Sequence, residues 1–287
     1  VQGITGKEGS RAAREMKEYG TKVVGGVAPG KGGQVTEDGF PVYESVRDAC
    51  IDYPEVDATL IVVPGKFVRS AVEEAIEAGI PLINILSESV PLIDVAYLIA
   101  KAQVSGIRIV GPSSVGIISP GKAKIGSIGS GGTVHRVFSS GNVGVISKSG
   151  GMTAEISRIL TEKGIGQSTA VGIGGDPLIG SDFLDIALLF ESDLETRALV
   201  VFGEVGGTYE EQLAEALNDG RITKPVVALI AGVFAETLPA ETPLGHAGAI
   251  IEGGRGAASS KIASLRKAGA LIADTPEDIV RLLETVL

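Results

Sequence analysis

The chain opens with VQGITGKEGS at residues 1–10, where Gly3, Gly6 and Gly9 stand at intervals of three between an apolar start and a helical pattern. This spacing is typical of a loop that joins a buried strand to a helix and lets the backbone approach a phosphate closely. The free N–H groups at the start of the helix would then face the anion. The alternative is an ordinary glycine turn that binds no phosphate, and this segment alone does not distinguish the two.

Strand and helix patterns alternate along the whole chain. In the first half, apolar runs predict strands at residues 22–27, 58–63, 81–86 and 107–110, with helices between them at, for example, 67–78 and 92–105. The second half predicts strands at 143–147, 169–173, 198–203 and 226–231, and helices at 152–163, 183–191, 209–218, 259–268 and 276–286. This alternation indicates doubly wound parallel sheets.

The glycine- and serine-rich segment 121–141 shows neither the apolar pattern of a helix nor that of a strand, and we expect it to link two domains. A length of 287 residues fits two domains of ordinary size. The last helix should begin with Thr275 as N-cap and Pro276 in its first turn. Thr208 and Glu211 have the spacing of a capping box for the helix at 209–218.

Composition excludes several classes of protein. No apolar run approaches the roughly 20 residues that span a bilayer, and a net charge of -10 without a basic stripe argues against nucleic-acid or anionic-membrane binding. The single cysteine, Cys50, fits a reducing compartment, so we expect the cytoplasm or, in a eukaryote, the mitochondrial matrix. Because Val1 lies inside an expected strand, we expect the natural N-terminus, with any targeting segment, to precede it.

His246 stands in the segment LGHAGA at residues 244–249, which leaves its imidazole accessible. A neutral imidazole nitrogen can attack a phosphoryl group and later pass it on. A histidine that only hydrogen-bonds its own loop is the alternative, but three other glycine-rich, phosphate-suited loops favour the reactive role. The other histidine, His135, lies beside Arg136 in the expected linker and is expected at the surface.

Two further loops of the second half follow strands and open helices. SKSGGMT at 147–153 offers free N–H groups and hydroxyls that can hold a transferable phosphoryl group. GEVGG at 203–207 places Glu204 at the carboxyl end of a strand, where α/β sheets present catalytic groups. A carboxylate there can accept the N–H of an imidazole and make its other nitrogen nucleophilic. GIGGDP at 172–177 is a third glycine loop at the same edge.

The loop after the second expected strand reads GVAPGKGG at residues 26–33 and contains no acidic residue. A dinucleotide-dependent dehydrogenase would need Asp or Glu there for the ribose hydroxyls, so this class is disfavoured. Lys31 instead suits a phosphorylated ribose, as in coenzyme A. A solvated loop lysine remains the alternative.

These motifs together resemble the α subunit of succinyl-CoA synthetase and, more broadly, the nucleoside-diphosphate-forming acid–CoA ligases. The resemblance covers essentially the whole chain through GITGKEG, GGVAPGKGG, KIG, VISKSGG, GQSTAVGIGGDP, GEVGGTYEE, TKPVV and GHAGAII, in the family's order and spacing. It implies an α/β fold with an N-terminal Rossmann-like CoA-binding domain over residues 1–122, followed by a flavodoxin-like ligase domain over residues 123–287.

The resemblance also implies the reaction and its residues. Acid, CoA and ATP or GTP would give acyl-CoA, ADP or GDP, and phosphate, with His246 as the phosphohistidine and Glu204 orienting it. The implied CoA site comprises Thr5, Gly6, Lys7, Glu8, Lys31, Leu86, Ser87 and Glu88, and the phosphate and substrate loop comprises Ser149, Gly150, Gly151, Thr153 and Ala154. A β subunit of ATP-grasp fold would bind most of the nucleotide with its Mg²⁺, and we expect no metal ligands in this chain.

Differences from the sequences of the succinate enzymes limit the choice of acid substrate. Those enzymes usually read SGTLTYE where this chain reads SGGMTAE at 149–155, so Ala154 replaces a tyrosine near the acid. Together with GPSSVG at 111–116 and GRITKP at 220–225, this variant looks more like the ligase portion of ATP-citrate lyase or citryl-CoA synthetase. The acid is therefore succinate or a bulkier polycarboxylate. A non-catalytic CoA-binding protein is the alternative of another class, although CoA binding alone needs neither His246 nor Glu204.

Overall fold

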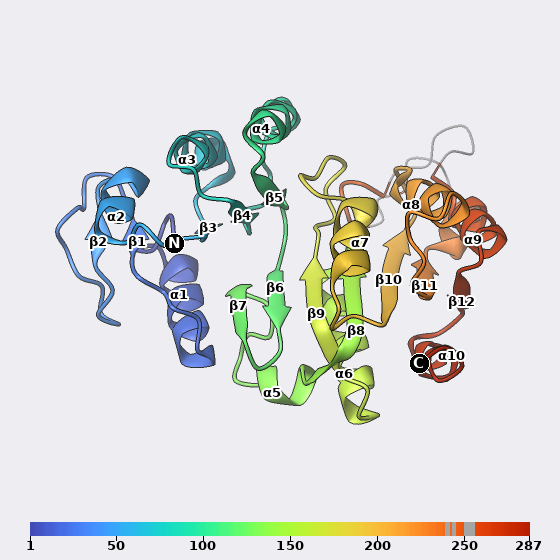
Figure 1. Cartoon of the computed structure of the whole chain (residues 1–287). Coiled ribbons are helices and arrows are strands. Elements are labelled where there is room, and N and C mark those ends of the chain that lie inside the picture. Colours follow the sequence, from blue (N-terminus) through green and yellow to red (C-terminus); the bar gives the residue numbers. More distant parts are fainter. Residues whose placement is uncertain (239–241, 243–244, 250–255) are drawn as a thin grey trace. The chain divides into compact units, whose positions relative to one another are not determined.

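The computed structural model describes residues 1–238, 242, 245–249 and 256–287, and it divides into two compact units (Figure 1). The first unit comprises Val1–Ile117, Lys122–Ile128 and Leu178–Gly180. The second comprises Ile118–Gly121, Gly129–Pro177 and Ser181–Leu287. The chain therefore returns twice to the first unit after it has first left it.

The first unit is built on short parallel strands. They are β1 (Gly26–Val27), β2 (Val42–Tyr43), β3 (Ala58–Ile61), β4 (Leu82–Ile85) and β5 (Arg108–Val110). Gln2 forms parallel bridges to both Val27 and Ile61, so the N-terminal segment lies between β1 and β3. The strands lie in the order β2, β1, Gln2 segment, β3, β4, β5. When the Gln2 segment is counted as strand 1 and β1 to β5 as strands 2 to 6, this order is 3-2-1-4-5-6, which is that of a Rossmann fold.

The helices of this unit are α1 (Lys7–Tyr19), α2 (Val46–Asp52), α3 (Gly65–Glu77) and α4 (Leu92–Ser105). Apolar residues at helical spacing on α3 and α4, among them Val68, Val72 and Leu98, pack with Ile83 and Ile85 of β4 in one buried cluster. The bounds of α4 are those predicted. The strand predicted at 22–27 is reduced to β1, because its neighbour β2 supplies ladder partners for two residues only.

The prediction of an irregular linker over 121–141 is wrong. That segment contains β7 (Ala123–Gly126) and α5 (Val134–Val137), and β6 (Gly116–Ser119) precedes it. Glycines with positive φ at both ends of β7, Gly121 at 79° and Gly126 at 95°, give the segment its turn-like composition. A strand of four residues is too short to show a clear period of two.

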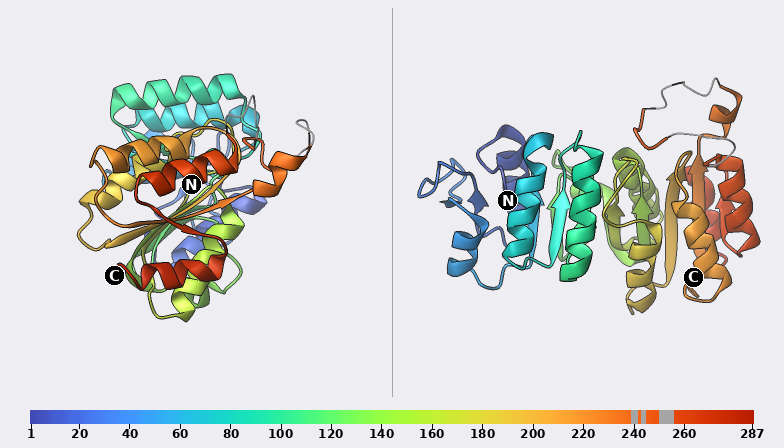
Figure 2. Two further views of the ribbon diagram at one scale, coloured as in Figure 1. Left: turned by 90° about the vertical axis from the view of Figure 1, so that its right-hand side faces the viewer. Right: turned by 90° about the horizontal axis from the view of Figure 1, so that it is seen from above.

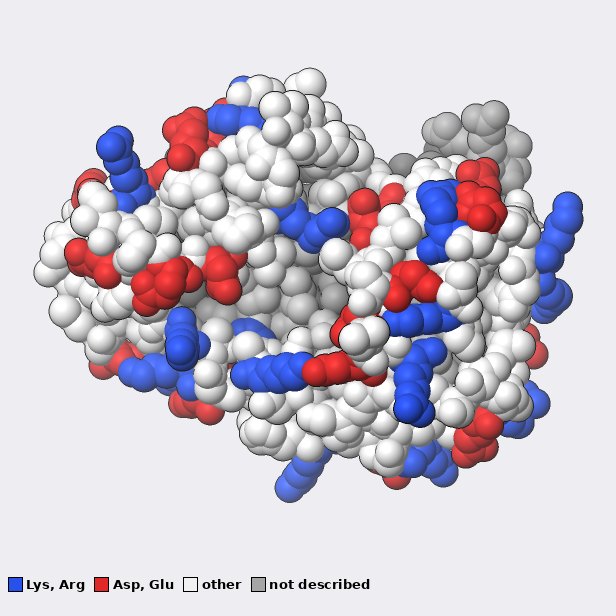
Figure 3. Space-filling view, in the orientation of Figure 1, with Lys and Arg blue, Asp and Glu red and all other residues white. Residues whose placement is uncertain are grey.

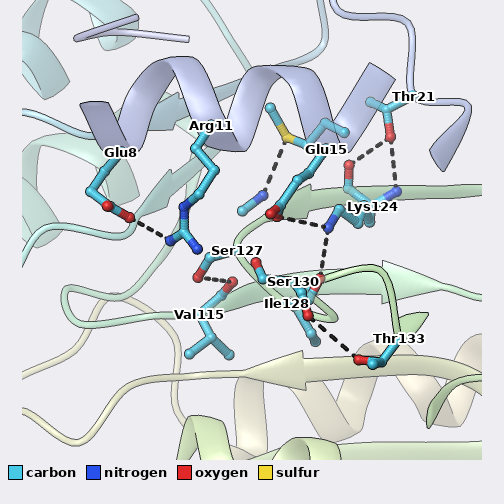
Figure 4. Close-up of polar contacts among 12 residues, drawn as sticks. Glu8, Arg11, Glu15, Thr21, Val115, Lys124, Ser127, Ile128, Ser130 and Thr133 are labelled. Carbon is cyan, nitrogen blue, oxygen red and sulfur yellow. Dashed lines mark hydrogen bonds and ion pairs between the residues drawn. The ribbon is translucent and has the colours of Figure 1, made fainter. Parts of the chain in front are cut away.

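Strand β7 is fastened to α1 through buried polar contacts (Figure 4). The Nζ atom of Lys124 donates to the carbonyl of Ile128 at 2.9 Å and lies 3.8 Å from a carboxylate oxygen of Glu15. The hydroxyl of Thr21 donates to the Lys124 carbonyl at 2.7 Å. Burial of the ammonium group lowers the pKa of Lys124. These contacts keep residues 122–128 in the first unit although they follow the first crossing into the second.

The second unit contains a parallel sheet between two layers of helices. Its strands are β8 (Ser140–Ser147), β9 (Gln167–Gly172), β10 (Ala198–Glu204), β11 (Val226–Ala231) and β12 (Leu271–Ala273). They lie in the order β9-β8-β10-β11-β12, which numbered from β8 is 2-1-3-4-5, the order of flavodoxin. Both halves of the predicted fold class are therefore confirmed.

Helices cover both faces of this sheet, which explains why its central strands are apolar throughout. One layer holds α7 (Phe183–Ser192), α8 (Tyr209–Asn218) and α9 (Ala258–Lys267), and the other holds α6 (Gly150–Glu162) and α10 (Pro276–Leu283). Figure 2 shows α8 and α9 on one side of the strands and α6 and α10 on the other. The prediction for α10 is confirmed, since Thr275 caps it through Asp278 and Pro276 lies in its first turn.

No helix in the described part of the chain is long and apolar enough to cross a membrane. On the face drawn in Figure 3, Lys and Arg side chains are mixed with Asp and Glu side chains rather than gathered in a patch of one sign.

Candidate active site

The strand order of the second unit reverses between β8 and β10, and the carboxyl ends of these two strands are neighbours. Ser147 at the end of β8 pairs with Phe202 of β10, two residues before Glu204. Lys148 follows β8, and Glu204 is the last residue of β10. In open α/β sheets, ligands bind outside the carboxyl ends of the strands at such a reversal.

His246 and Glu204 are in direct contact there. Nδ1 of His246 lies 2.6 Å from Oε2 of Glu204, and the side chains are 36% and 12% exposed respectively. The hydrogen bond to Glu204 raises the pKa of His246, while partial burial opposes this. In the neutral ring, a proton on Nδ1 donated to the carboxylate leaves the lone pair on Nε2 free to react.

The glycine loop that follows β9 holds the imidazole from another side. The backbone N–H of Gly248 donates to the carbonyl of Gly175 at 3.0 Å. A Cβ atom on Gly175 would lie 2.9 Å from Cγ and 3.0 Å from Nδ1 of His246. Since Cβ atoms do not tolerate contacts this short, a side chain at residue 175 would force the ring of His246 or its loop to shift.

The loop 147–153 makes a well-formed helix start. Ser149 is the N-cap of α6, and its hydroxyl accepts the N–H of Met152 at 3.4 Å. Ser147 accepts the N–H of Ser149 at 3.1 Å, while the hydroxyl of Thr153 donates to the Ser149 carbonyl at 2.7 Å. Thr153 is fully buried and its hydroxyl serves the helix. Gly151 is exposed, whereas Ser149, Gly150 and Ala154 are half-buried.

Three buried charged residues behind this site were not identified from the sequence. Lys148 is 3% exposed, with Nζ 3.9 Å from Oε1 of Glu204 and 5.6 Å from the centre of the Tyr209 ring. Lys261 and Glu210 form a fully buried ion pair, and Lys261 also donates to the Gly206 carbonyl at 2.6 Å. An isolated Lys or Glu in a sequence does not reveal that it is buried, so no sequence signal marked them.

The capping box predicted from Thr208 and Glu211 is wrong. Thr208 precedes α8 with φ -134° and ψ 18°, and its side chain makes no capping bond. The neighbouring Glu210 turns inward to Lys261 and accepts the N–H of Glu204 at 3.2 Å. The first turn of α8 is therefore placed by a buried ion pair instead of a cap.

In the first unit, the structure brings two of the predicted CoA-site residues together. Nζ of Lys31 donates to the hydroxyl of Thr5 at 3.1 Å, and both residues are exposed. The N–H groups of Gly30 and Gly32 donate to the carboxylate of Glu44 at 2.7 and 3.2 Å. Glu44, which the sequence did not single out, thus holds the loop that presents Lys31.

The remaining predicted CoA-site residues follow strands of the same sheet. Gly6, Lys7 and Glu8 start α1 and are exposed, and Glu8 pairs with Arg11. Leu86, Ser87 and Glu88 follow β4, where Leu86 and Ser87 are half-buried and Glu88 is exposed. The Ser87 hydroxyl donates to the Val63 carbonyl at 2.6 Å, so it fastens one loop to another. All these loops start at the carboxyl ends of parallel strands.

Among the residues that the structure describes, no group of three or more His, Cys, Asp or Glu side chains is arranged to hold a metal ion.

Comparison with protein families and known proteins agrees with this arrangement. Residues 1–89 match the CoA binding domain family, and residues 146–271 match the CoA-ligase family. Over 287 residues the chain is 46% identical to a succinate–CoA ligase [ADP-forming] subunit alpha 1 of Archaeoglobus fulgidus, covering 94% of that protein. It is 43% identical over 284 residues, 99% of this chain and 94% of the relative, to an ADP-forming sulfoacetate–CoA ligase subunit of an Acholeplasma species.

A solved structure also matches over the whole chain. The ATP citrate lyase of Methanosaeta concilii in complex with (3S)-citryl-CoA has a TM-score of 0.92 and 27% sequence identity, and the match covers 49% of the lyase chain. The chain thus spans about half the length of that lyase. On the strength of the full-length relatives, the chain belongs to the family of the α subunits of succinate–CoA ligase and related ADP-forming acid–CoA ligases.

Proposed function

We propose that this chain is the α subunit of a ligase that joins a di- or tricarboxylic acid to CoA, with His246 carrying the phosphoryl group. The observation that carries the proposal is the 2.6 Å contact between Nδ1 of His246 and Glu204 at the strand-order reversal of the second unit. That contact leaves Nε2 as the reacting nitrogen. The family membership supplies the class of reaction.

The reaction divides into three transfers. Nε2 of His246 attacks the terminal phosphorus of ATP or GTP, and the bond to the diphosphate breaks. A carboxylate oxygen of the acid then attacks the phosphohistidine, which returns the ring to its neutral form and gives an acyl phosphate. Finally the CoA thiol loses its proton, its sulfur attacks the acyl carbon, and phosphate leaves. In both phosphoryl transfers Glu204 holds the Nδ1 proton and keeps the ring oriented.

The proposal assigns the two substrates to different parts of the chain. CoA would be bound within residues 1–122, through the loops that contain Thr5, Lys31 and Ser87, and phosphoryl transfer would occur within residues 123–287. The nucleotide and its Mg²⁺ would be bound mainly by a β subunit of ATP-grasp fold, in agreement with the names of the relatives as α subunits. A cytoplasmic location, or the matrix in a eukaryote, is part of the same proposal.

Thioester formation by the chain purified with its β subunit tests this function. Supplied with CoA and ATP or GTP, the complex should convert succinate or citrate to its CoA thioester and release one phosphate per thioester. Conversion of sulfoacetate alone, the acid named for one relative, would overturn the choice of a di- or tricarboxylic acid. Omitting any one substrate should stop the reaction. Tight CoA binding without thioester formation from any of the acids would instead favour a non-catalytic CoA-binding protein.

The Ala154→Tyr variant tests the choice of acid. Ala154 lies in the first turns of α6, half-buried, where the succinate enzymes usually have a tyrosine. If the substrate is citrate, the added ring should depress citrate turnover far more than succinate turnover, because the hydroxyl and third carboxylate need the space. Initial rates with the two acids measure this. A wild-type complex that converts succinate well and ignores citrate would rule out the bulkier substrate.

The Lys31→Ala variant should bind CoA more weakly. A charge-assisted hydrogen bond to a phosphate contributes about 1.5–3 kcal/mol, so we expect the Kd to rise by roughly 10- to 150-fold. Titration calorimetry with CoA and with dephospho-CoA measures the change, and dephospho-CoA should narrow the gap if the 3′-phosphate is the partner. Lys22→Ala is the control, because Lys22 precedes β1 at the opposite end of that strand. Equal affinities of Lys31→Ala and wild type would leave Lys31 as a solvated loop residue.

A further inference from the structure

Glu204 has one oxygen bonded to His246 and one that lacks a hydrogen-bond partner. Its Oε1 atom is buried without such a partner among the described residues. Among the described residues, the lysine that forms an ion pair with Glu204 is Lys148, whose Nζ lies 3.9 Å from Oε1, beyond a hydrogen bond. The Lys148 side chain is 1% exposed, so its charge acts on Glu204 with little screening by solvent.

A buried carboxylate beside a nucleophilic histidine has two opposing effects. It orients the ring, but it also stabilises the imidazolium, which has no lone pair on Nε2 and cannot attack phosphorus. A histidine paired with Glu204 alone would spend more of its time protonated near neutral pH. A positive charge close to the carboxylate would reduce the second effect and leave the first in place.

We propose that Lys148 is the positioning residue that balances the charge of Glu204, so that the ring of His246 stays oriented yet neutral. The proposal rests on the phosphohistidine function given above. Lys148 is suited to this by its place, since it directly follows β8 at the strand-order reversal, while Glu204 ends the neighbouring strand. The ring of Tyr209 packs on its ammonium group and helps to keep it there.

The surrounding charges support this balance. The groups that act on His246 are Glu204 and Asp176, which raise its pKa, and Lys148, which lowers it. Burial lowers the pKa of Lys148 itself, while Glu210, Glu204 and Glu211 favour its charged form and Lys261 disfavours it. The charge of Lys148 thus interacts both with the buried Lys261–Glu210 pair and with Glu204. Once Nε2 carries a phosphoryl group, the same ammonium also offsets the negative charge added beside Glu204.

The test compares Lys148→Met, which removes the charge, with Lys148→Arg, which retains it. Histidine NMR titration of the full chain reports the protonation of His246 directly, and His135 serves as an internal reference because the chain has two histidines. Removing a nearby positive charge stabilises the imidazolium, so His246 of Lys148→Met should titrate at higher pH than wild type. Lys148→Arg should titrate close to wild type.

The rate of phosphohistidine formation in the complex gives a second readout. In Lys148→Met we expect a loss on the order of tenfold below neutral pH that is recovered as the pH is raised, because the neutral ring is the nucleophile. A merely structural defect would lower the rate equally at every pH. Lys224→Met is the matched control, because Lys224 is a half-buried lysine of the same unit that bonds backbone carbonyls instead. If Lys148→Met does not fold, Lys148→Gln replaces it.

Failure of this inference is distinguishable from failure of the proposed function. A wild-type complex that forms no phosphohistidine would overturn the function, while the NMR titration would still measure the effect of Lys148 on His246. A phosphorylated wild type together with an unchanged or lowered His246 titration in Lys148→Met would overturn the role of Lys148.

Discussion

Incubation of the complex with ATP labelled at the terminal phosphate is expected to label this chain, and the His246→Asn variant is expected to carry no label. Asparagine retains a polar group of similar size but has no nucleophilic nitrogen, so the loss should be complete. Phosphohistidine is labile in acid and stable in base, which distinguishes it from phosphoserine. Autoradiography after acid and base treatment measures both properties.

His135→Asn is the control for that experiment. His135 is exposed in α5 and lies far along the chain from Glu204 and the Gly175 loop. This variant should be labelled like wild type. Labelling of His246→Asn at the wild-type level would show that another residue receives the phosphoryl group.

Glu204→Gln should slow phosphohistidine formation by roughly 10²–10⁴-fold. The amide oxygen can still accept the N–H of His246, but the negative charge that stabilises the developing imidazolium character is lost. CoA affinity should remain unchanged, because the predicted CoA residues all belong to the first unit and Glu204 to the second. Rapid-quench labelling and calorimetry measure the two quantities separately.

The matched control is Glu215→Gln, because Glu215 is an exposed glutamate of α8 in the same unit. It should leave both the labelling rate and CoA binding at wild-type values. If Glu204→Gln formed phosphohistidine as fast as Glu215→Gln, the carboxylate would have no part in the transfer.

Periodicity in the sequence predicted the long elements well. The bounds of α4, α8 and β11 coincide with the predicted ones, because each buries a continuous apolar stripe or run. The strands β2, β6, β7 and β12 were not predicted, since two to four residues are too few to show a period. Periodicity also could not predict the strand order. The Gln2 segment lies between β1 and β3 because it pairs with residues that are distant in the sequence.

The sequence predicted those site residues whose side chains can react and which also lie in a glycine-rich loop or at a strand end. Glu204 at a strand end and His246 in a glycine loop could be connected in advance, because parallel strands bring their carboxyl ends to one edge. Lys148 and the Lys261–Glu210 pair could not, because their burial depends on how three separate elements pack. The misassigned capping box shows the same limit, since Glu211 has the right spacing while Glu210 forms the buried ion pair.

The close fit of the His246 ring against Gly175 has an evolutionary consequence. A side chain at that position would meet the ring of His246 and no backbone atom of the sheet among its nearest neighbours, so it would displace the ring or its loop. A copy of the gene that encodes alanine there is expected to keep the sheets of both units and the loops proposed to hold CoA, while the proposed phosphoryl transfer is impaired. Residue 175 is thus a position at which the proposed transfer could be lost without loss of the fold.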